Sequence, residues 1–342
     1  MRTLKKPSTA HCNKDMYVSY LLSEPDYTSC SKLAFVMNDL SHDSVNRFLE
    51  REDYTPEDLF REISADLTLE GGVLSIDDSV LDKPYSDPEK AKLISYFWSG
   101  KHKKVVKGIN LVTLYYTDVH GICMPVNYRV YDKEKGKTKN DYFCEMLMES
   151  IKWGIVPAWV TGDSWYGSLE NLKFLRKQGL SFLFGTDNNR RISIEKSSYI
   201  QIQSLINWPE SGLIVYLKEY GNVRVFRQVY KNVHRYYIMS VPKLEMLDGI
   251  QSIDFERVHS AHWNIERFHR AVKQTCNIER FQVRNSRSIM NHIFCSICAF
   301  VKLESLRSKQ SIQNWYQIKR DLFVGVIKQF ISKGGADAFV NA

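Results

Sequence analysis

The stretch VPAWVTGDSWYGSLENLKFL, residues 156–175, joins an apolar run, an abrupt break at Gly162-Asp163 and the start of a helical pattern. The apolar run predicts a buried strand over 155–161, and the spacing of the later apolar residues predicts a helix. A polar turn at the end of a buried strand is where α/β sheets build their sites. Two side chains here are candidates for chemistry: the Asp163 carboxylate as a metal ligand and the Ser164 hydroxyl as a nucleophile.

A second buried strand also leads into acids. In GGVLSIDDSVLDKPYS, residues 71–86, an apolar run over 73–76 is followed directly by Asp77 and Asp78. If the two strands are parallel, their carboxyl ends meet at one edge of the sheet. Because Asp after a strand is also common turn chemistry, neither motif alone establishes a site.

The other patterns between residues 70 and 187 predict a mixed sheet with helices packed against it. Strand-like runs alternate with segments of helical periodicity, and turn residues at 118–121 favour a hairpin. The expected strands are 73–76, 109–117, 122–131, 155–161 and 180–184, and the expected helices are 142–153 and 167–178. This order predicts the α/β (α+β) class.

The chain changes character on either side of this region. Residues 188–250 are rich in β-branched and aromatic residues, with a hairpin expected around Gly221-Asn222. Residues 1–69 have the pattern of short helices, one of which begins at Thr55-Pro56. We interpret this segment as a helical packing module. A DNA-end-binding helix-turn-helix is the alternative, and it would present Asn46 and Arg47.

Positive charge is concentrated in the second half of the chain. The formal net charge is +8, yet residues 1–70 carry 8 Lys and Arg against 13 Asp and Glu. Residues 188–243 carry 9 against 3, and residues 264–333 carry 13 against 4. Such a field indicates a polyanionic partner, and a solvated basic surface is the alternative.

The composition is that of a globular protein. With 342 residues, 44% of them hydrophobic and 25% charged, the chain can bury a core, and its length predicts two or three domains. No apolar run approaches the ~18 residues of a membrane span, and the first residues lack a signal-peptide pattern. Seven cysteines without regular spacing favour reduced thiols. We therefore expect a cytoplasmic protein without a membrane partner.

A third acid lies in HSAHWNIERFHRAVKQ, residues 259–274, which has helical periodicity. At about 100° per residue, one helical stripe groups Glu266 with His259, His262, Arg270 and Lys273. A separate apolar stripe, expected to be buried, contains Ala261, Ile265, Phe268 and Val272. Solvated faces usually mix charges of both signs, whereas Glu266 is alone among basic and imidazole groups and is expected to stay ionised. Glu266 is therefore a candidate metal ligand whose neighbours hold phosphates.

The three motifs together resemble the catalytic blocks of DDE transposases from bacterial insertion sequences. SIDDS, VTGDSWYGS and HWNIERFHRAVKQ match that family in order and in strand or helix placement, over roughly residues 70–305. Asp77 and Asp163 are 86 residues apart, and Asp163 and Glu266 are 103 apart. The second gap is long enough for the β-strand insertion of one subgroup. The resemblance thus implies an RNase H-like core, flanked by helices and interrupted by a β-rich insertion.

This resemblance divides the chain into five segments. They are a helical module at 1–69, the first part of the core with both Asp at 70–187, a basic β-rich insertion at 188–250, a core helix with the catalytic Glu at 251–305, and a C-terminal helical segment at 306–342. The helical module is the candidate for DNA-end binding.

The resemblance also implies roles for single residues. The family's Asp-x-Ser/Thr triplet selects Asp77 over Asp78, so the implied catalytic residues and metal ligands are Asp77, Asp163 and Glu266. A Lys seven positions after the Glu is matched by Lys273. The Tyr and Arg expected seven and four positions before it are His259 and His262 in this chain. The implied contacts to DNA phosphate are Lys273, Arg270, His259 and His262.

The chemistry follows from the implied ligand set. Carboxylates suit Mg²⁺ or Mn²⁺, and two ions per site would clamp the attacking and leaving oxygens of a displacement at phosphorus. We expect nicking at the end of an element and joining of the freed 3′-OH to target DNA. The implied partners are double-stranded DNA, as terminal inverted repeats and as target, and a second copy in a homodimer. The implied location is the bacterial cytoplasm, at the nucleoid.

Two other functions fit parts of the sequence. A serine hydrolase would use Ser164 as nucleophile, although GDSWYG is one residue too long for a G-x-S-x-G elbow. If Asp163 acts instead, Ser164 is expected to cap the following helix. A catalytically inactive, transposase-derived DNA-binding protein would keep the fold and bind DNA without cleaving it.

Packing explains the remaining candidate ligands better than function does. In HIFCSIC, residues at intervals of three along one helix give a poor zinc geometry, and Cys in an apolar helix is usually core. These residues are His292, Cys295 and Cys298. Three aromatic residues are candidates for stacking on an unpaired base, with core packing as the alternative: Trp165, Tyr166 and Trp208.

Overall fold

The structure, a computed structural model, describes residues 11–333 and divides into two compact units. The first unit contains residues 11–59, 80–109 and 268–333, and the second contains residues 60–79 and 110–267. Each unit is therefore assembled from segments that are far apart in the sequence. Four elements continue from one unit into the other: α4 (Pro56–Ile63), β1 (Val73–Asp82), β3 (Lys104–Thr117) and α7 (Ser252–Thr275).

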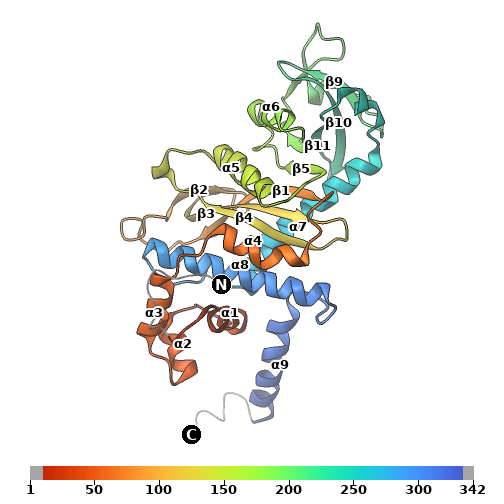
Figure 1. The fold of residues 1–342 in the computed structure, drawn as a ribbon. Coiled ribbons are helices and arrows are strands. Elements are labelled where there is room, and N and C mark those ends of the chain that lie inside the picture. Colours follow the sequence, from red (N-terminus) through yellow and green to blue (C-terminus); the bar gives the residue numbers. More distant parts are fainter. Residues whose placement is uncertain (1–10, 334–342) are drawn as a thin grey trace. The chain divides into compact units, whose positions relative to one another are not determined.

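A mixed sheet forms the centre of the second unit (Figure 1). Its strand order is β4-β3-β1-β5-β6-β11-β10-β9. Strands β1, β5 and β6 pair in parallel, whereas the β3–β4 pair and the β6–β11–β10–β9 series are antiparallel. The bounds are β4 (Cys123–Val130), β5 (Trp159–Gly162), β6 (Ser181–Thr186), β9 (Leu213–Leu217), β10 (Gly221–Tyr230) and β11 (Val233–Ser240). The expected mixed α/β fold is confirmed.

Helices cover both faces of this sheet. On one face lie α5 (Lys139–Lys152) and α6 (Leu169–Lys177) (Figure 1). Phe143 of α5 packs on Phe184 of β6, with ring centroids 6.2 Å apart. The preceding residue, Leu183, joins a buried cluster with Phe255 and Val258 of α7. Because neighbouring strand residues point to opposite faces, α5 and α7 lie on opposite sides of β6.

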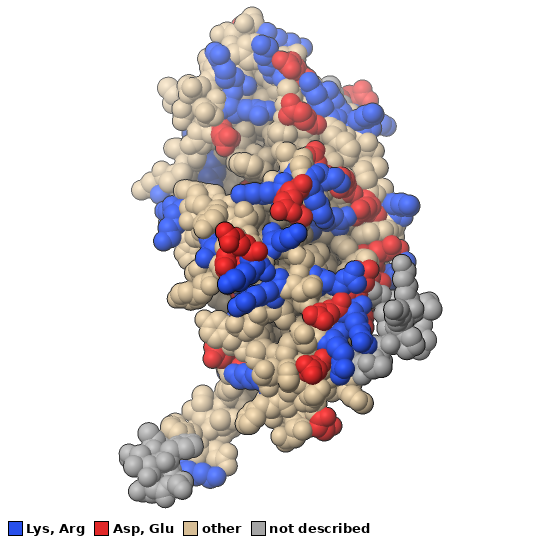
Figure 2. Space-filling view, turned by 90° about the vertical axis from the view of Figure 1, so that its left-hand side faces the viewer, with Lys and Arg blue, Asp and Glu red and all other residues tan. Residues whose placement is uncertain are grey.

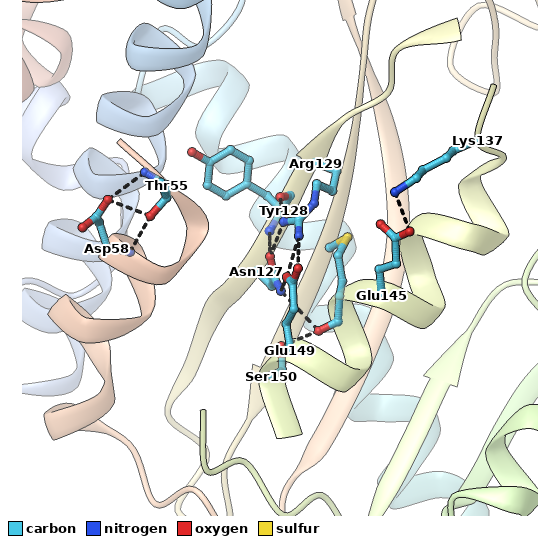
Figure 3. A network of polar contacts seen from close by, with 10 residues as sticks. Thr55, Asp58, Asn127, Tyr128, Arg129, Lys137, Glu145, Glu149 and Ser150 are labelled. Atoms are coloured by element: carbon cyan, nitrogen blue, oxygen red, sulfur yellow. Dashed lines mark hydrogen bonds and ion pairs between the residues drawn. The ribbon is translucent and has the colours of Figure 1, made fainter. Parts of the chain in front are cut away.

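Helix α5 is fastened at both ends. At its N-terminus Thr138 and Asp141 form a reciprocal capping box. Further along, Arg129 Nη2 on β4 donates to Glu149 Oε1 at 2.6 Å, and Asn127 Nδ2 donates to Glu149 Oε2 at 3.0 Å (Figure 3). These contacts fix the helix start, and with it Lys139.

The β-rich stretch joins the core sheet instead of forming a sheet of its own. Strand β11 pairs antiparallel with β6, with Ile238 opposite Phe184. The hairpin expected around Gly221 is β9–β10, and β10 begins at that glycine. A second hairpin, β10–β11, turns at Lys231-Asn232, where φ is 49° and 63°. Positive φ at both positions is the geometry of a type I′ turn. Two short strands, β7 (Arg191–Ile192) and β8 (Ile200–Gln201), pair separately.

Two local expectations from the sequence were wrong. Strand β1 does not end before the acids but continues to Asp82, because it keeps β3 as a neighbour after its pairing with β5 has ended at Ile76. Ser164 does not cap the helix that follows. Its carbonyl accepts a turn hydrogen bond from Gly167, and the cap of α6 is Ser168, whose Oγ accepts from Asn171 N at 3.2 Å.

The first unit packs the N-terminal helices on the long helix α8 (Ser286–Ser308) (Figure 1). Asn291 Nδ2 of α8 donates to Leu49 O at 2.7 Å, and Phe294 stacks on Tyr54 with centroids 4.2 Å apart. Ser41 caps the helix at residues 42–51, because its Oγ accepts a hydrogen bond from Ser44 N. The other elements are α1 (Lys14–Ser23), α2 (Cys30–Met37), α3 (His42–Arg51), α9 (Gln317–Ser332) and β2 (Ser95–Ser99), which pairs with the start of β3.

Helix α8 is long and apolar enough to cross a membrane by length and composition alone, although the sequence contains no contiguous apolar run of that length. However, 72% of its most apolar window is buried inside the protein. His292 is fully buried, 2.9 Å from the Tyr17 hydroxyl, and burial lowers its pKa to about 3. Cys295 and Cys298 are buried as well. These side chains form the core of the first unit.

Candidate active site

Two acids lie side by side at the ends of parallel strands in the second unit. In the register of β1 and β5, Ile76 is the partner of Gly162, so the next residues, Asp77 and Asp163, emerge at the same edge. The glycine permits this close approach, because a Cβ on it would lie 2.7 Å from the Ile76 side chain. The strand-end prediction for this pair is therefore confirmed in its geometry.

The electrostatic environment of Asp163 is strongly negative. Reduced hydration in a concave pocket is the largest cause, and the nearby Asp77 and Asp78 carboxylates add to it, so that the pKa of Asp163 rises to about 7. The Trp165 N–H donates to Asp163 Oδ1 at 3.0 Å and opposes the shift only in part. Like charges held this close favour a bound cation. The carboxylate oxygens are ligands that suit a hard divalent ion.

The neighbouring Asp78 is engaged by other groups. Strand alternation turns it to the opposite side of β1 from Asp77. Its carboxylate accepts three hydrogen bonds, from Asn110 Nδ2 at 2.6 Å, Lys139 Nζ at 2.7 Å and the Tyr166 hydroxyl at 3.1 Å. This saturation favours Asp77 over Asp78 as the ligand.

Glu266 lines the same pocket as Asp163. The pocket has a volume of about 400 Å³, and α7 and β11 form two of its walls. Within residues 11–333, no three His, Cys, Asp or Glu side chains stand close enough together to hold a metal ion as they are placed. Asp77 therefore lies beside Asp163, and Asp163 and Glu266 line the same pocket. The three acids do not form a three-ligand cluster as they are placed.

The family model described as the transposase DDE domain matches residues 69–301, which include all three acids. This chain belongs to that family. The transposase resembles, in fold, a piggyBac transposase solved as a synaptic complex with hairpin DNA. The TM-score is 0.53 at 14% identity, over 97% of this chain and 75% of that chain.

A further similar structure is the Drosophila P element transposase in a strand transfer complex, with a TM-score of 0.30 at 11% identity, over 95% of this chain and 88% of that one. No curated protein matches the sequence. The family match, together with the strand-end acids, makes this protein a transposase.

The histidines expected to contact DNA differ in their surroundings in this transposase. His259 Nε2 lies 3.1 Å from the Tyr237 hydroxyl, and its ring stacks on Phe255. Burial, with the nearby Arg235 charge, lowers the pKa of His259. His259 is therefore neutral at physiological pH and can offer a hydrogen bond, but no charge, to a phosphate. His262 is half-buried and lines the pocket with Glu266.

The two basic residues expected beyond Glu266 also differ from each other. Both lie in the part of α7 that belongs to the first unit. Lys273 Nζ donates to Val80 O at 2.6 Å and lies 3.0 Å from Glu279 Oε1, so its charge is already neutralised. Arg270 is solvent-exposed. Of the pair, Arg270 is better placed to meet a phosphate.

The sequence did not identify the β11 wall of the pocket. Arg235 and His234 are exposed there, and Tyr237 reaches His259. Figure 2 shows Lys and Arg side chains over the region of β9–β11, interspersed with a few Asp and Glu side chains. The only signal for this wall was the basic composition of residues 188–243, because its pairing with β6 left no local pattern.

The aromatic candidates for base stacking differ in their exposure to solvent. Tyr166 is fully buried between α5 and Asp78 and cannot meet a base. Trp165 is 61% exposed beside Asp163. Trp263 of α7, which the sequence did not single out, is 47% exposed and lines the pocket.

Proposed function

We propose that this transposase cleaves DNA at the ends of an insertion sequence and joins the freed 3′-OH to target DNA, with Asp77, Asp163 and Glu266 as metal ligands. The proposal is supported most by one observation: Asp77 and Asp163 lie together at parallel strand ends, where burial and, after it, the neighbouring carboxylates raise the pKa of Asp163 to about 7. Such a pair is poised to bind a divalent cation.

The carboxylates fit Mg²⁺ or Mn²⁺ in the two-ion arrangement that the family resemblance implies. Ions bound there would activate water and stabilise the attacking and leaving oxygens at phosphorus. The protein's own part is to hold the scissile phosphate in line with the acids. Glu266 would close the site from α7, by a movement of that helix or of its side chain once a cation draws the carboxylates together.

Basic groups on β11 and on α7 would supply contacts for the DNA. Arg235 and His234 on β11 are exposed at the pocket wall, and Arg270 is exposed on α7. We propose that these residues, with His262, hold backbone phosphates, while the neutral His259 and the paired Lys273 make weaker contributions. The partners would be double-stranded DNA, as terminal repeats and target, and a second copy of the chain in a homodimer.

The test is strand transfer from a pool of short duplexes that carry randomised terminal sequences and free 3′-OH ends. With supercoiled plasmid as target and Mg²⁺ present, we expect covalent joints whose sequencing reveals the preferred end. Asp77→Asn, Asp163→Asn and Glu266→Gln should reduce the joints to background. Asp248→Asn, an exposed acid of the same unit, should retain them.

Three results would contradict this proposal. If Asp163→Asn formed joints at the wild-type level, this carboxylate would not be a metal ligand. If the wild-type chain bound DNA but formed no joints with Mg²⁺ or with Mn²⁺, the protein would instead be an inactive DNA-binding protein. Ester hydrolysis lost in Ser164→Ala would favour the serine hydrolase.

A further inference from the structure

Asp78 connects three elements around the paired acids. Its carboxylate on β1 accepts hydrogen bonds from Asn110 on β3, from Lys139 at the first turn of α5, and from Tyr166 in the loop after β5. All four residues belong to the second unit. Asp78 is therefore the common acceptor of a network that spans the strand carrying Asp77 and the loop carrying Asp163.

The donors are themselves held in place. Tyr166 is fully buried and packs on Phe143 of α5, with ring centroids 5.8 Å apart. Its carbonyl accepts from Asn171 Nδ2 at 2.9 Å, and the same amide donates to Asn140 Oδ1 at 2.9 Å. The loop after β5 is thus hydrogen-bonded to both α5 and α6. These contacts hold the Tyr166 hydroxyl in position to donate to Asp78.

The position of Asp78 in its strand links this network to the acids. Consecutive strand residues point to opposite faces, so fixing the Asp78 side chain fixes the direction of Asp77. Tyr166 is three residues after Asp163, and a turn from Ser164 O to Gly167 N encloses that segment. The Lys139 ammonium, which also lies 5.4 Å from the Trp165 ring centroid, neutralises Asp78.

We propose that Asp78, Lys139 and Tyr166 are positioning residues that hold Asp77 and Asp163 at the separation needed to share a cation. Lys139 serves as a built-in counter-ion that keeps Asp78 out of the ligand set. This inference rests on the proposed function of the paired acids. Partners that orient metal ligands commonly contribute 10- to 100-fold to metal affinity.

The test is Mn²⁺ binding to the full-length chain without DNA, followed by the electron paramagnetic resonance signal of free Mn²⁺. Tyr166→Phe removes one hydroxyl and keeps the ring. We expect it, like Asp78→Asn and Lys139→Met, to weaken Mn²⁺ binding by about 10- to 100-fold. Lys139→Arg keeps the charge and should restore most of the affinity.

Matched controls separate positioning from general stability. Tyr115→Phe removes another buried hydroxyl bond, to Cys123 O, at the far end of β3 from Asn110. Lys137→Met removes a lysine two residues from Lys139 that pairs with Glu145 instead (Figure 3). Both controls should keep wild-type Mn²⁺ affinity, and Tyr115→Phe should lower the melting temperature as much as Tyr166→Phe does.

The outcomes distinguish this inference from the proposed function. Unchanged Mn²⁺ affinity in Tyr166→Phe and Asp78→Asn would overturn the positioning role while leaving the function intact. Tighter binding in Lys139→Met would also overturn it, by showing that a released Asp78 becomes a ligand. The proposed function fails if wild type does not bind Mn²⁺, or if its Mn²⁺ binding survives in Asp77→Asn and Asp163→Asn. This inference then fails with it.

Discussion

Gly162 lies opposite Ile76 where the parallel strands β5 and β1 stop pairing, and a Cβ at position 162 would come within 2.7 Å of the Ile76 side chain. On the other side the same Cβ would lie 2.8 Å from the Phe184 ring. The missing side chain thus allows the strands to converge at the point from which the two acids emerge.

Replacing this glycine should damage both the fold and the site. Because the neighbours belong to a packed sheet, we expect Gly162→Ala to lower the free energy of unfolding by about 1–3 kcal/mol and to weaken Mn²⁺ binding. Chemical denaturation and metal titration measure the two effects. Gly249→Ala, where no atom lies within 4 Å of an added Cβ, should change neither, and an equal loss in both variants would contradict the expectation.

The raised pKa of Asp163 predicts how stability depends on pH. Its ordinary value of 3.8 rises to about 7 in the folded chain, so the folded state keeps a proton that the unfolded state releases in this window. Stability without metal therefore falls as the pH rises from about 4 to about 7. In EDTA, we expect Asp163→Asn to match wild type at low pH and to exceed it above pH 7, by on the order of 1 kcal/mol because the residue is partly solvated.

The same comparison with metal provides the check. Mg²⁺ at high pH should raise the melting temperature of wild type and not that of Asp163→Asn, since only wild type presents the charged pair. Parallel pH profiles for the two proteins in EDTA would show that Asp163 titrates normally.

The N-terminal helices should depend on one buried amide of α8. Asn291 Nδ2 donates to Leu49 O and Glu52 O, and its Oδ1 accepts from Tyr54 N. Asn291→Ala leaves these backbone groups unsatisfied, so we expect a loss of about 2–4 kcal/mol in the free energy of unfolding. Asn46→Ala, which removes only a 3.4 Å hydrogen bond to Glu50 on the same helix, should cost less than about 0.5 kcal/mol. Equal urea midpoints for the two variants would contradict this assignment.

DNA affinity should respond differently to two basic residues on α7. Each phosphate contact contributes about 0.9 to the slope of log affinity against log salt. We expect Arg270→Ala to reduce that slope by about 0.9 on duplex DNA, measured by fluorescence anisotropy. Lys273→Met should leave it nearly unchanged, because Glu279 and Val80 O already hold the ammonium. The reverse order would identify Lys273 as the phosphate contact. Arg235→Ala tests the β11 wall in the same way.

Local patterns predicted much of this site, and non-local pairing accounts for the rest. The apolar runs before Asp77 and Asp163 and the stripes around Glu266 are properties of single elements, so periodicity predicted them. The buried stripe that includes Ala261 and Ile265 is confirmed. Arg235 and Tyr237 were missed because they reach the pocket only through the pairing of β11 with β6, which no local pattern encodes. For the same reason no local pattern predicted that Lys139 pairs with Asp78.

The proposed chemistry requires that Asp77 and Asp163 bind a divalent cation together with Glu266. Anomalous diffraction from crystals soaked in Mn²⁺ tests it most directly. We expect an anomalous peak within about 2.0–2.4 Å of Asp77 and Asp163 carboxylate oxygens, with Glu266 drawn toward it from the same pocket. A peak elsewhere, with both Asp side chains free of metal, would contradict it.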